Sequence, residues 1–277
     1  MIRIAVCAPA TPITRDVAER VLALAAAEFP GLELQFHEQC FALAGHFAGA
    51  DDVRLDALLD CANDPAIDAV WFAKGGYGSN RIAGAALAAL NEHARRKSFL
   101  GYSDCGFLLA GLYRAAIGRP VHAPMPVDVR REGGEAAVRR TLSWLVGDIG
   151  GLEPSLAGAP SAAFNLMTLS SLIGTDLMPN LAGHVVMVEE IAEHLYAVDR
   201  LLFHLVANLA GRGIAGLRLG RVSNVPDNDR PFGHEPEAMA RYWCERYGVA
   251  YLGTADIGHC AANKIVPFGL AAPGPRA

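Results

Sequence analysis

A serine stands at the junction between a predicted strand and a predicted helix. The apolar run 99–102 has the pattern of a strand and residues 105–116 have helical spacing, so Ser103 lies at the turn between them. This arrangement is typical of a nucleophile elbow, which lifts a serine hydroxyl above a sheet at the start of a helix. The G-x-S-x-G spacing of such elbows is not met, because Gly106 comes one residue late. Ser103 could therefore also be a helix N-cap.

A glycine-rich loop at 74–79, with the sequence KGGYGS, follows the apolar run 67–73. Its glycines allow backbone N–H groups to approach a ligand closely. Such a loop suits either an oxyanion hole or a cradle for a phosphate group. Neither common nucleotide-binding pattern, G-x-G-x-x-G or G-x-x-x-x-G-K-[ST], is present, so a nucleotide site is disfavoured. The loop could also be a turn that binds no ligand.

A serine nucleophile needs a general base, and the base needs a carboxylate that orients it. Among the nine histidines, His259 lies in a loop of small residues at 256–263, and such a loop can present an imidazole to a pocket. Two acids, Glu189 and Glu190, follow the apolar run that predicts a strand at 184–188. An acid that leaves a buried strand is either a charge at the rim or a functional group.

A metal site has weaker support in the sequence. Glu190 and His194 are four residues apart, so they could share one helix face as metal ligands. No third ligand lies at a useful spacing. We therefore expect neither a metal site nor a cofactor.

The first half of the chain alternates short apolar runs with segments of helical spacing. The pattern predicts strands at 2–8, 32–36, 67–73 and 99–102, and helices at 16–29, 51–62, 81–90 and 105–116. This order predicts an α/β fold in which a parallel sheet carries helices on both faces. Ligands bind such sheets at the carboxyl ends of the strands, where the glycine-rich loop and the serine lie.

A stretch rich in glycine, proline, alanine and serine, 147–160, separates the two halves and predicts a linker. Beyond it, the pattern predicts strands at 184–188, 217–222, 250–252 and 265–268 and helices at 195–209 and 236–247. The second half therefore has enough regular structure to form a domain of its own.

The composition excludes several classes of protein. In 277 residues, 24 basic and 29 acidic side chains leave a formal charge of −5, so no positive surplus exists for binding a nucleic-acid backbone. No uncharged apolar run reaches the roughly 18 residues of a membrane helix, and the first apolar run is too short for a signal peptide. The six cysteines form no C-x-x-C pair, which is typical of reduced thiols. We expect a cytoplasmic protein that binds neither nucleic acid nor a membrane.

Taken together, these motifs resemble the LD-carboxypeptidase family of serine peptidases, which includes muropeptide carboxypeptidases and microcin C self-immunity peptidases. Six segments match in order: AKGGYGSNR at 73–81, GYSD at 101–104, HAPM at 122–125, FNL at 164–166, VEE at 188–190 with Tyr196, Asp199 and Arg200 beyond it, and GH at 258–259 with Asn263. The chain departs from the family pattern where Lys74 replaces an arginine and where Ala123, Ala163, Phe164 and Cys260 replace glycines. These departures bear on substrate choice more than on reaction class.

The resemblance implies a catalytic triad of Ser103, Glu189 and His259. Ser103 would attack an amide carbonyl, His259 would act first as base and then as acid, and Glu189 would hold the imidazole. The order of the three residues along the chain is the order of the family motifs.

The resemblance also implies an oxyanion hole and a set of substrate contacts. Backbone N–H groups of Asp104 and Gly76 would bind the oxyanion, although Gly75 is equally well placed in the sequence. The residue after the nucleophile is a common donor in elbow enzymes. The further candidate substrate contacts are Lys74, Arg81 and Asn165.

The family fold implies a Rossmann-like domain at 1–147 that carries the nucleophile, a linker at 148–163, and a smaller β-rich (α+β) domain at 164–277. Because the serine belongs to the first domain and the other two triad members to the second, the site would lie between them. The resemblance further implies a homodimer.

The activity that the resemblance implies is removal of the terminal D-Ala from murein tetrapeptides, a step of peptidoglycan recycling. Three other functions fit parts of the sequence: a microcin-immunity-type amidase acting on a peptidyl nucleotide, an α/β-hydrolase esterase, and a two-domain protein that binds a small ligand without catalysis. The short chain argues against the amidase. The inexact elbow and the strand-poor second half argue against the esterase.

Overall fold

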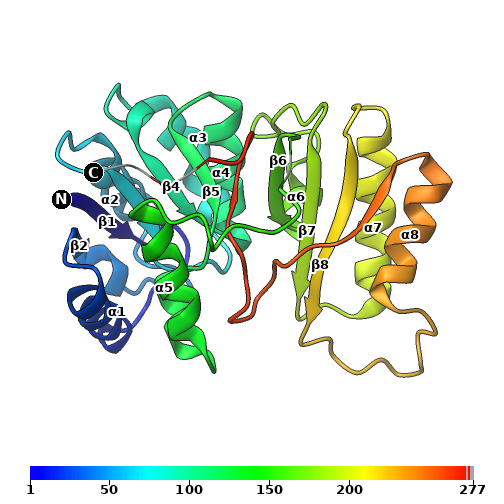
Figure 1. Cartoon of the computed structure of the whole chain (residues 1–277), viewed down its shortest axis with the longest axis horizontal. Coiled ribbons are helices and arrows are strands. Elements are labelled where there is room, and N and C mark those ends of the chain that lie inside the picture. The colour runs from blue at the N-terminus through cyan, green and yellow to red at the C-terminus, as the bar shows by residue number, and fades with distance from the viewer. Residues whose placement is uncertain (157, 273, 275–277) are drawn as a thin grey trace.

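Two β-sheets organise the chain in the computed structural model, which describes residues 1–156, 158–272 and 274. The first sheet has six strands in the order β10-β5-β4-β3-β1-β2, and the second has four in the order β6-β7-β8-β9. The sheets lie side by side along the long axis of the molecule (Figure 1). The predicted α/β class with a parallel sheet in the N-terminal half is confirmed.

The first sheet is parallel except at one edge, where β10 runs antiparallel to β5. Helices α1 and α5 pack together on one face, and α2, α3 and α4 pack in a row on the other. The strands are β1 Ile2–Cys7, β2 Leu32–Phe36, β3 Ala69–Phe72, β4 Ser98–Gly101, β5 Arg119–His122 and β10 Val266–Pro267. The helices are α1 Arg15–Glu28, α2 Asp51–Asn63, α3 Ser79–Ala89, α4 Gly106–Arg114 and α5 Gly134–Leu145.

The second sheet is parallel throughout, and α6, α7 and α8 pack in a row against it. Its strands are β6 Ser161–Asn165, β7 Val185–Ile191, β8 Gly216–Ser223 and β9 Tyr251–Thr254. Its helices are α6 Leu166–Leu172, α7 Leu195–Ala210 and α8 Pro236–Tyr247. Parallel strands need long crossovers, which these helices supply.

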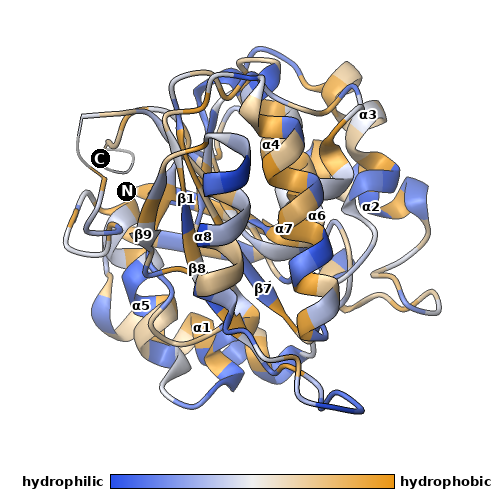
Figure 2. Ribbon diagram, turned by 90° about the vertical axis from the view of Figure 1, so that its right-hand side faces the viewer, coloured by the Kyte–Doolittle hydropathy of each residue, from blue (hydrophilic) through white to orange (hydrophobic). Residues whose placement is uncertain are grey.

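The burial of side chains explains the apolar runs and the apolar helical spacing in the sequence. All four residues of β3 are buried, because helices cover both faces of the first sheet. Helix α7 buries a stripe at helical spacing, formed by Val198, Leu202, Leu205, Val206 and Leu209. Figure 2 shows this apolar helix behind α8, seen from the end of the second sheet. None of the helices in the described part of the chain has the length and apolar character that a membrane crossing requires.

One apolar core extends across both halves of the molecule. It runs from the face covered by α2, α3 and α4 to the face covered by α6, α7 and α8, and α4 packs directly on α6. A Cβ on Gly106, at the start of α4, would lie 3.0 Å from the methyl group of Thr168 in α6. Glycine at this position therefore allows α4 and α6 to pack closely, and this close packing joins the two halves of the core.

Residues 265–269, which we call the closing segment, connect the two sheets. Val266 and Pro267 form β10 and pair with β5 of the first sheet. Two residues further on, Gly269 exchanges backbone hydrogen bonds of 2.8 and 2.9 Å with Ser161 of β6. The last part of the second half therefore completes the first sheet (Figure 1).

Candidate active site

Ser103 directly follows β4, where a single 3-10 turn, η3 Ser103–Cys105, leads into α4. Its φ angle is 59°, in the left-handed region that residues with a side chain seldom adopt. A strained turn of this kind between a parallel strand and a helix is the geometry of a nucleophile elbow. Ser103 is not the N-cap of α4, because Cys105 occupies that position.

The glycine-rich loop lies directly against the serine. A Cβ on Gly75 would come within 2.8 Å of the Ser103 Cβ and 2.9 Å of its Oγ. Thr11 fixes this loop by donating a 2.5 Å hydrogen bond to the Gly75 carbonyl, and Gly76 has a φ of 82°. Within the described residues, no protein group accepts a hydrogen bond from the N–H of Asp104 or of either glycine. These N–H groups can therefore bind a ligand oxygen.

Asp104 connects the elbow to the end of the glycine-rich loop. Its carboxylate accepts a 2.8 Å hydrogen bond from the Ser79 N–H, and its backbone carbonyl accepts one of 2.6 Å from the Ser79 hydroxyl. Burial raises the pKa of the Asp104 carboxyl, and the hydrogen bonds from Ser79 partly offset that rise. The start of α3 and the η3 turn that leads into α4 are thus held together beside the serine.

A buried arginine, which the sequence pattern did not single out, holds the same loop from the other side. Arg54 of α2 has no exposed surface, and its guanidinium donates to the carbonyls of Pro9 and Gly78. It also pairs with Asp51 and lies 4.7 Å from the centre of the Phe47 ring. An arginine in a helix usually lies at the surface, so this role of Arg54 has no signal in the sequence.

The second half of the chain supplies a paired histidine and carboxylate. The Nδ1 of His259 lies 2.7 Å from a carboxylate oxygen of Glu189, which is fully buried. Glu189 lies at a β-bulge where β7 pairs with β8, between Val188 and Glu190, and bulges re-aim side chains. When Nδ1 donates its proton to the carboxylate, Nε2 is left as a proton acceptor. This is the arrangement of a general base and its orienting acid.

The loop that carries His259 is held by buried polar groups. Asn263 accepts a 3.1 Å hydrogen bond from the Gly258 N–H and lies 3.0 Å from Nε2 of His122 at the end of β5. Burial lowers the pKa of His122, so its neutral ring can donate to the Asn263 oxygen. The Tyr102 ring, next to the serine, lies 4.8 Å from the His259 ring. The first half therefore positions the histidine that the second half supplies.

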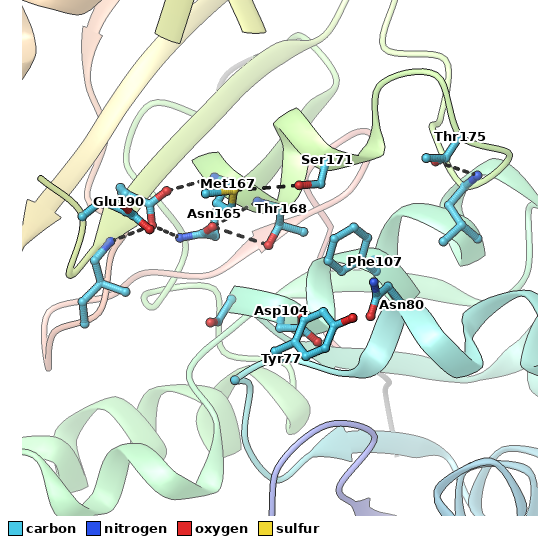
Figure 3. Close-up of a pocket in the computed structure, with 15 residues that line it drawn as sticks. Tyr77, Asn80, Asp104, Phe107, Asn165, Met167, Thr168, Ser171, Thr175 and Glu190 are labelled. Atoms are coloured by element: carbon cyan, nitrogen blue, oxygen red, sulfur yellow. Dashed lines mark hydrogen bonds between the residues drawn. The ribbon is translucent and has the colours of Figure 1, made fainter. Parts of the chain in front are cut away.

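Ser103 lines two hollows. The large hollow, about 600 Å³, lies between the glycine-rich loop, α4 and α6. In Figure 3 Tyr77, Asn80, Asp104 and Phe107 lie on one side of it and Asn165, Met167, Thr168 and Glu190 on the other. The second, about 270 Å³, has His259 in its wall and is called the histidine-side recess; it is also lined by Lys74, Tyr102, Arg130 and Arg131.

The structure places the remaining candidate residues as follows. Lys74 lines the histidine-side recess. Asn165 lines the large hollow, caps α6 by accepting from the Thr168 N–H at 3.1 Å, and donates to Glu190. Arg81 lines neither hollow; it forms a half-exposed ion pair of 2.7 Å with Asp51.

Glu190 does not join His259: it lines the large hollow, and His259 lines the histidine-side recess. Its carboxylate accepts hydrogen bonds from the Asn165 amide at 2.6 Å and from the N–H groups of Met167 and Ile191 at 2.9 Å. Burial raises the pKa of the Glu190 carboxyl. His194 instead stacks on Tyr196. In the described ranges, no three potential metal-ligating side chains form a group that could hold a metal ion.

Solved structures share this fold. The chain superposes on the muramoyltetrapeptide carboxypeptidase from Oxalobacter formigenes with a TM-score of 0.80, at 22% identity over 96% of this chain and 93% of that one. It superposes on the microcin C7 self immunity protein in its wild-type apo state with a TM-score of 0.79, at 17% identity over 97% and 91% of the two chains.

Sequence comparisons identify the family. Models of the LD-carboxypeptidase N-terminal and C-terminal domains match residues 4–123 and 161–273. The chain is 26% identical to the murein tetrapeptide carboxypeptidase of Pseudomonas aeruginosa, over 98% of this chain and 92% of that protein. It is 27% identical to a probable murein peptide carboxypeptidase of Bacillus subtilis, over 97% and 87%. The chain belongs to the LD-carboxypeptidase family and is a serine-type carboxypeptidase.

Proposed function

We propose that this carboxypeptidase removes the C-terminal D-Ala from murein tetrapeptides by a Ser103, His259 and Glu189 mechanism. The observation that carries the proposal is the 2.7 Å contact between the buried Glu189 and His259, whose ring lines the same recess as the strained Ser103. A related carboxypeptidase of P. aeruginosa is named for the same substrate.

The mechanism assigns one step to each side chain. His259 takes the proton of the Ser103 hydroxyl through Nε2 as the oxygen attacks the carbonyl of the scissile bond. The N–H groups of Gly76 and Asp104 bind the resulting oxyanion, an interaction for which one donor is worth ~3 kcal/mol in comparable sites. His259 then protonates the leaving amine, and Glu189 stabilises the imidazolium that exists between the two transfers. Water releases the acyl group by the same steps in reverse.

The wider role follows from the family resemblance. We propose that the enzyme acts in the cytoplasm, in peptidoglycan recycling, and as a homodimer. Sedimentation equilibrium of the purified protein tests the dimer, because it measures the mass of the assembly directly. A monomeric mass at micromolar concentration would exclude the dimer without affecting the proposed chemistry.

A second candidate function is hydrolysis of a peptidyl nucleotide, as in a microcin-immunity-type amidase. The large hollow favours it in one respect, because Tyr77 and Phe107 contribute aromatic rings to its wall. Nucleic-acid bases stack on such rings. The two functions differ in their substrates and can be separated by direct assay.

The test is mass spectrometry of the purified protein incubated with murein tripeptide, tetrapeptide, pentapeptide and a peptidyl-nucleotide amide. We expect loss of one alanine from the tetrapeptide and no change in the tripeptide. Cleavage of the peptidyl nucleotide alone would favour the second function. An unchanged tetrapeptide would exclude the proposed substrate.

Substituting Gly75 by alanine should lower kcat by at least ~100-fold, because a displacement of the reacting group by about 1 Å costs that much. The new methyl group would lie 2.8 Å from the Ser103 Cβ. The φ of Gly75 is not positive, so its backbone suits alanine and the protein should remain folded. Gly84→Ala in α3 is the matched control, since its Cβ meets no atom within 4 Å. Wild-type turnover of Gly75→Ala on tetrapeptide would contradict the close approach.

Exhaustive chelation should leave kcat unchanged, because the proposed nucleophile is activated by an imidazole rather than by a Lewis acid. The measurement is tetrapeptide turnover after dialysis against a strong chelator, with metal content checked by mass spectrometry. Loss of activity that zinc restores would instead support Glu190 and His194 as metal ligands.

A further inference from the structure

The two hollows beside Ser103 carry opposite charge. Among the described residues that line the histidine-side recess, three are cationic and none is acidic: Lys74, Arg130 and Arg131. The large hollow has the reverse pattern, with no lysine or arginine in its described lining and with Asp104, Glu190 and Glu193 in its wall. A substrate that spans the serine therefore meets positive charge on one side only.

A nearby carboxylate neutralises only one of the three cations of the recess, Arg131. Arg131 pairs at 2.8 Å with the buried Asp128, whose oxygens also accept hydrogen bonds from the Tyr102 hydroxyl and the Met125 N–H, each at 2.8 Å. Arg130 reaches Asp16 only at 3.7 Å, and both side chains are about half-exposed. Exposed pairs of this kind contribute little.

Lys74 has no ion-pair partner among the described residues. Burial lowers the pKa of its ammonium group, and the positive charge of Arg130 lowers it further. An anion bound between the two side chains would relieve this repulsion and would form charge-assisted hydrogen bonds.

The position of the histidine decides which part of the substrate enters the recess. His259 lines the recess and not the large hollow. In a serine peptidase the histidine protonates the leaving amine, so the leaving residue must lie on the histidine's side of the nucleophile. A recess of about 270 Å³ suits one small residue rather than a peptide.

We infer that Lys74 and Arg130 bind the free α-carboxylate of the leaving residue in the histidine-side recess. This inference rests on the proposed function, because a leaving residue with a free carboxylate is what a carboxypeptidase releases. It makes the recess the part of the site that distinguishes the end of a peptide from its interior.

The test compares kcat/KM for murein tetrapeptide and for the same peptide with its terminal carboxylate amidated. Wild type should prefer the free acid by at least ~10-fold, since the amide loses a charged hydrogen bond. Lys74→Met and Arg130→Gln should each reduce this preference, and the double variant should bring it close to 1, by lowering kcat/KM for the free acid only. Arg131 is left unchanged, because its removal would leave the buried Asp128 unpaired.

Arg20→Gln is the matched control: it removes one cation from a half-exposed pair with Glu135, outside both hollows, and should keep the wild-type preference. Binding to the inactive Ser103→Ala protein, measured by calorimetry, tests the recess without turnover. Tighter binding of the free acid that depends on Lys74 and Arg130 supports the inference. Equal binding and equal kcat/KM for acid and amide overturn it.

The same experiment distinguishes failure of the inference from failure of the proposed function. If the wild-type enzyme hydrolyses the acid and the amide equally well, the enzyme does not recognise the carboxylate and the inference fails, but the proposed serine chemistry still stands. If the wild-type enzyme hydrolyses neither peptide but Ser103→Ala binds the free acid selectively, the inference about the recess is supported. The proposed function, with the tetrapeptide as substrate, is then excluded. Variants that keep the full preference for the acid exclude Lys74 and Arg130 as its source.

Discussion

Replacing Ser103 by alanine should reduce kcat for tetrapeptide by roughly 10⁵–10⁶-fold, the loss seen when a serine nucleophile is removed from a comparable triad. The hydroxyl is the group of the elbow that forms the covalent bond with the substrate in the proposed mechanism. The fold should be unaffected or slightly stabilised, because alanine removes only one oxygen at a strained position with a φ of 59°. Single-turnover hydrolysis and thermal unfolding measure the two effects.

The other triad members provide the check on this prediction. Adding His259→Ala to Ser103→Ala should cause little further loss, since members of a triad act as a unit. Ser143→Ala, at a half-buried position of α5, is the matched control and should keep wild-type turnover. Near wild-type kcat in Ser103→Ala would show that another group performs the attack.

Glu189→Gln should lower kcat by about 10⁴-fold, as loss of the orienting carboxylate does in a comparable triad. The substitution keeps the size of the side chain but removes the charge that stabilises the imidazolium. It also allows an amide N–H to face Nδ1 of His259, now 2.7 Å from the carboxylate, and so to favour the wrong tautomer. KM should change far less than kcat, because Glu189 lines neither hollow.

Glu245→Gln makes the same chemical change on the exposed side of α8, and it should leave both kinetic constants unchanged. Circular dichroism and the thermal midpoint should show that Glu189→Gln is folded. If folded Glu189→Gln turned over tetrapeptide within tenfold of wild type, the carboxylate would not be part of the catalytic machinery.

Much of the candidate site could be predicted because its parts follow predicted strands. Ser103 and the glycine-rich loop come after β4 and β3, and parallel strands bring their carboxyl ends to one edge of the sheet. The contact between Glu189 and His259 could not be derived from spacing, since 70 residues separate the two. Only the family resemblance paired them in advance.

The sequence does not reveal β5 or α5, for identifiable reasons. Strand β5 contains Pro120, and proline within a run argues against a strand because it cannot donate to the ladder. Helix α5 begins after Gly133, whose φ is 67°, and the adjacent glycines resemble a loop.

The sequence also does not reveal that the cations of the histidine-side recess lie at the site. Arg130 is the last residue of a short 3-10 turn, η4 Pro126–Arg130, and Arg131 follows it; by sequence both look like solvated surface charges. They reach the site because Asp128 holds this turn against Tyr102, through a buried 2.8 Å hydrogen bond. Arg81 has the more suggestive position in the sequence, but its side chain is directed to Asp51.

The closing segment affects when the active site can be completed during synthesis of the chain. Chains emerge from the ribosome N-terminal end first, and their early parts begin to fold during synthesis. Strands β1 to β5 and the elbow are made well before β10 and the loop of His259, which follow them in the chain. Under the proposed mechanism, a nascent chain that lacks the His259 loop has the serine but no base to activate it. We therefore expect such chains to be inert toward peptides until the closing segment has been translated.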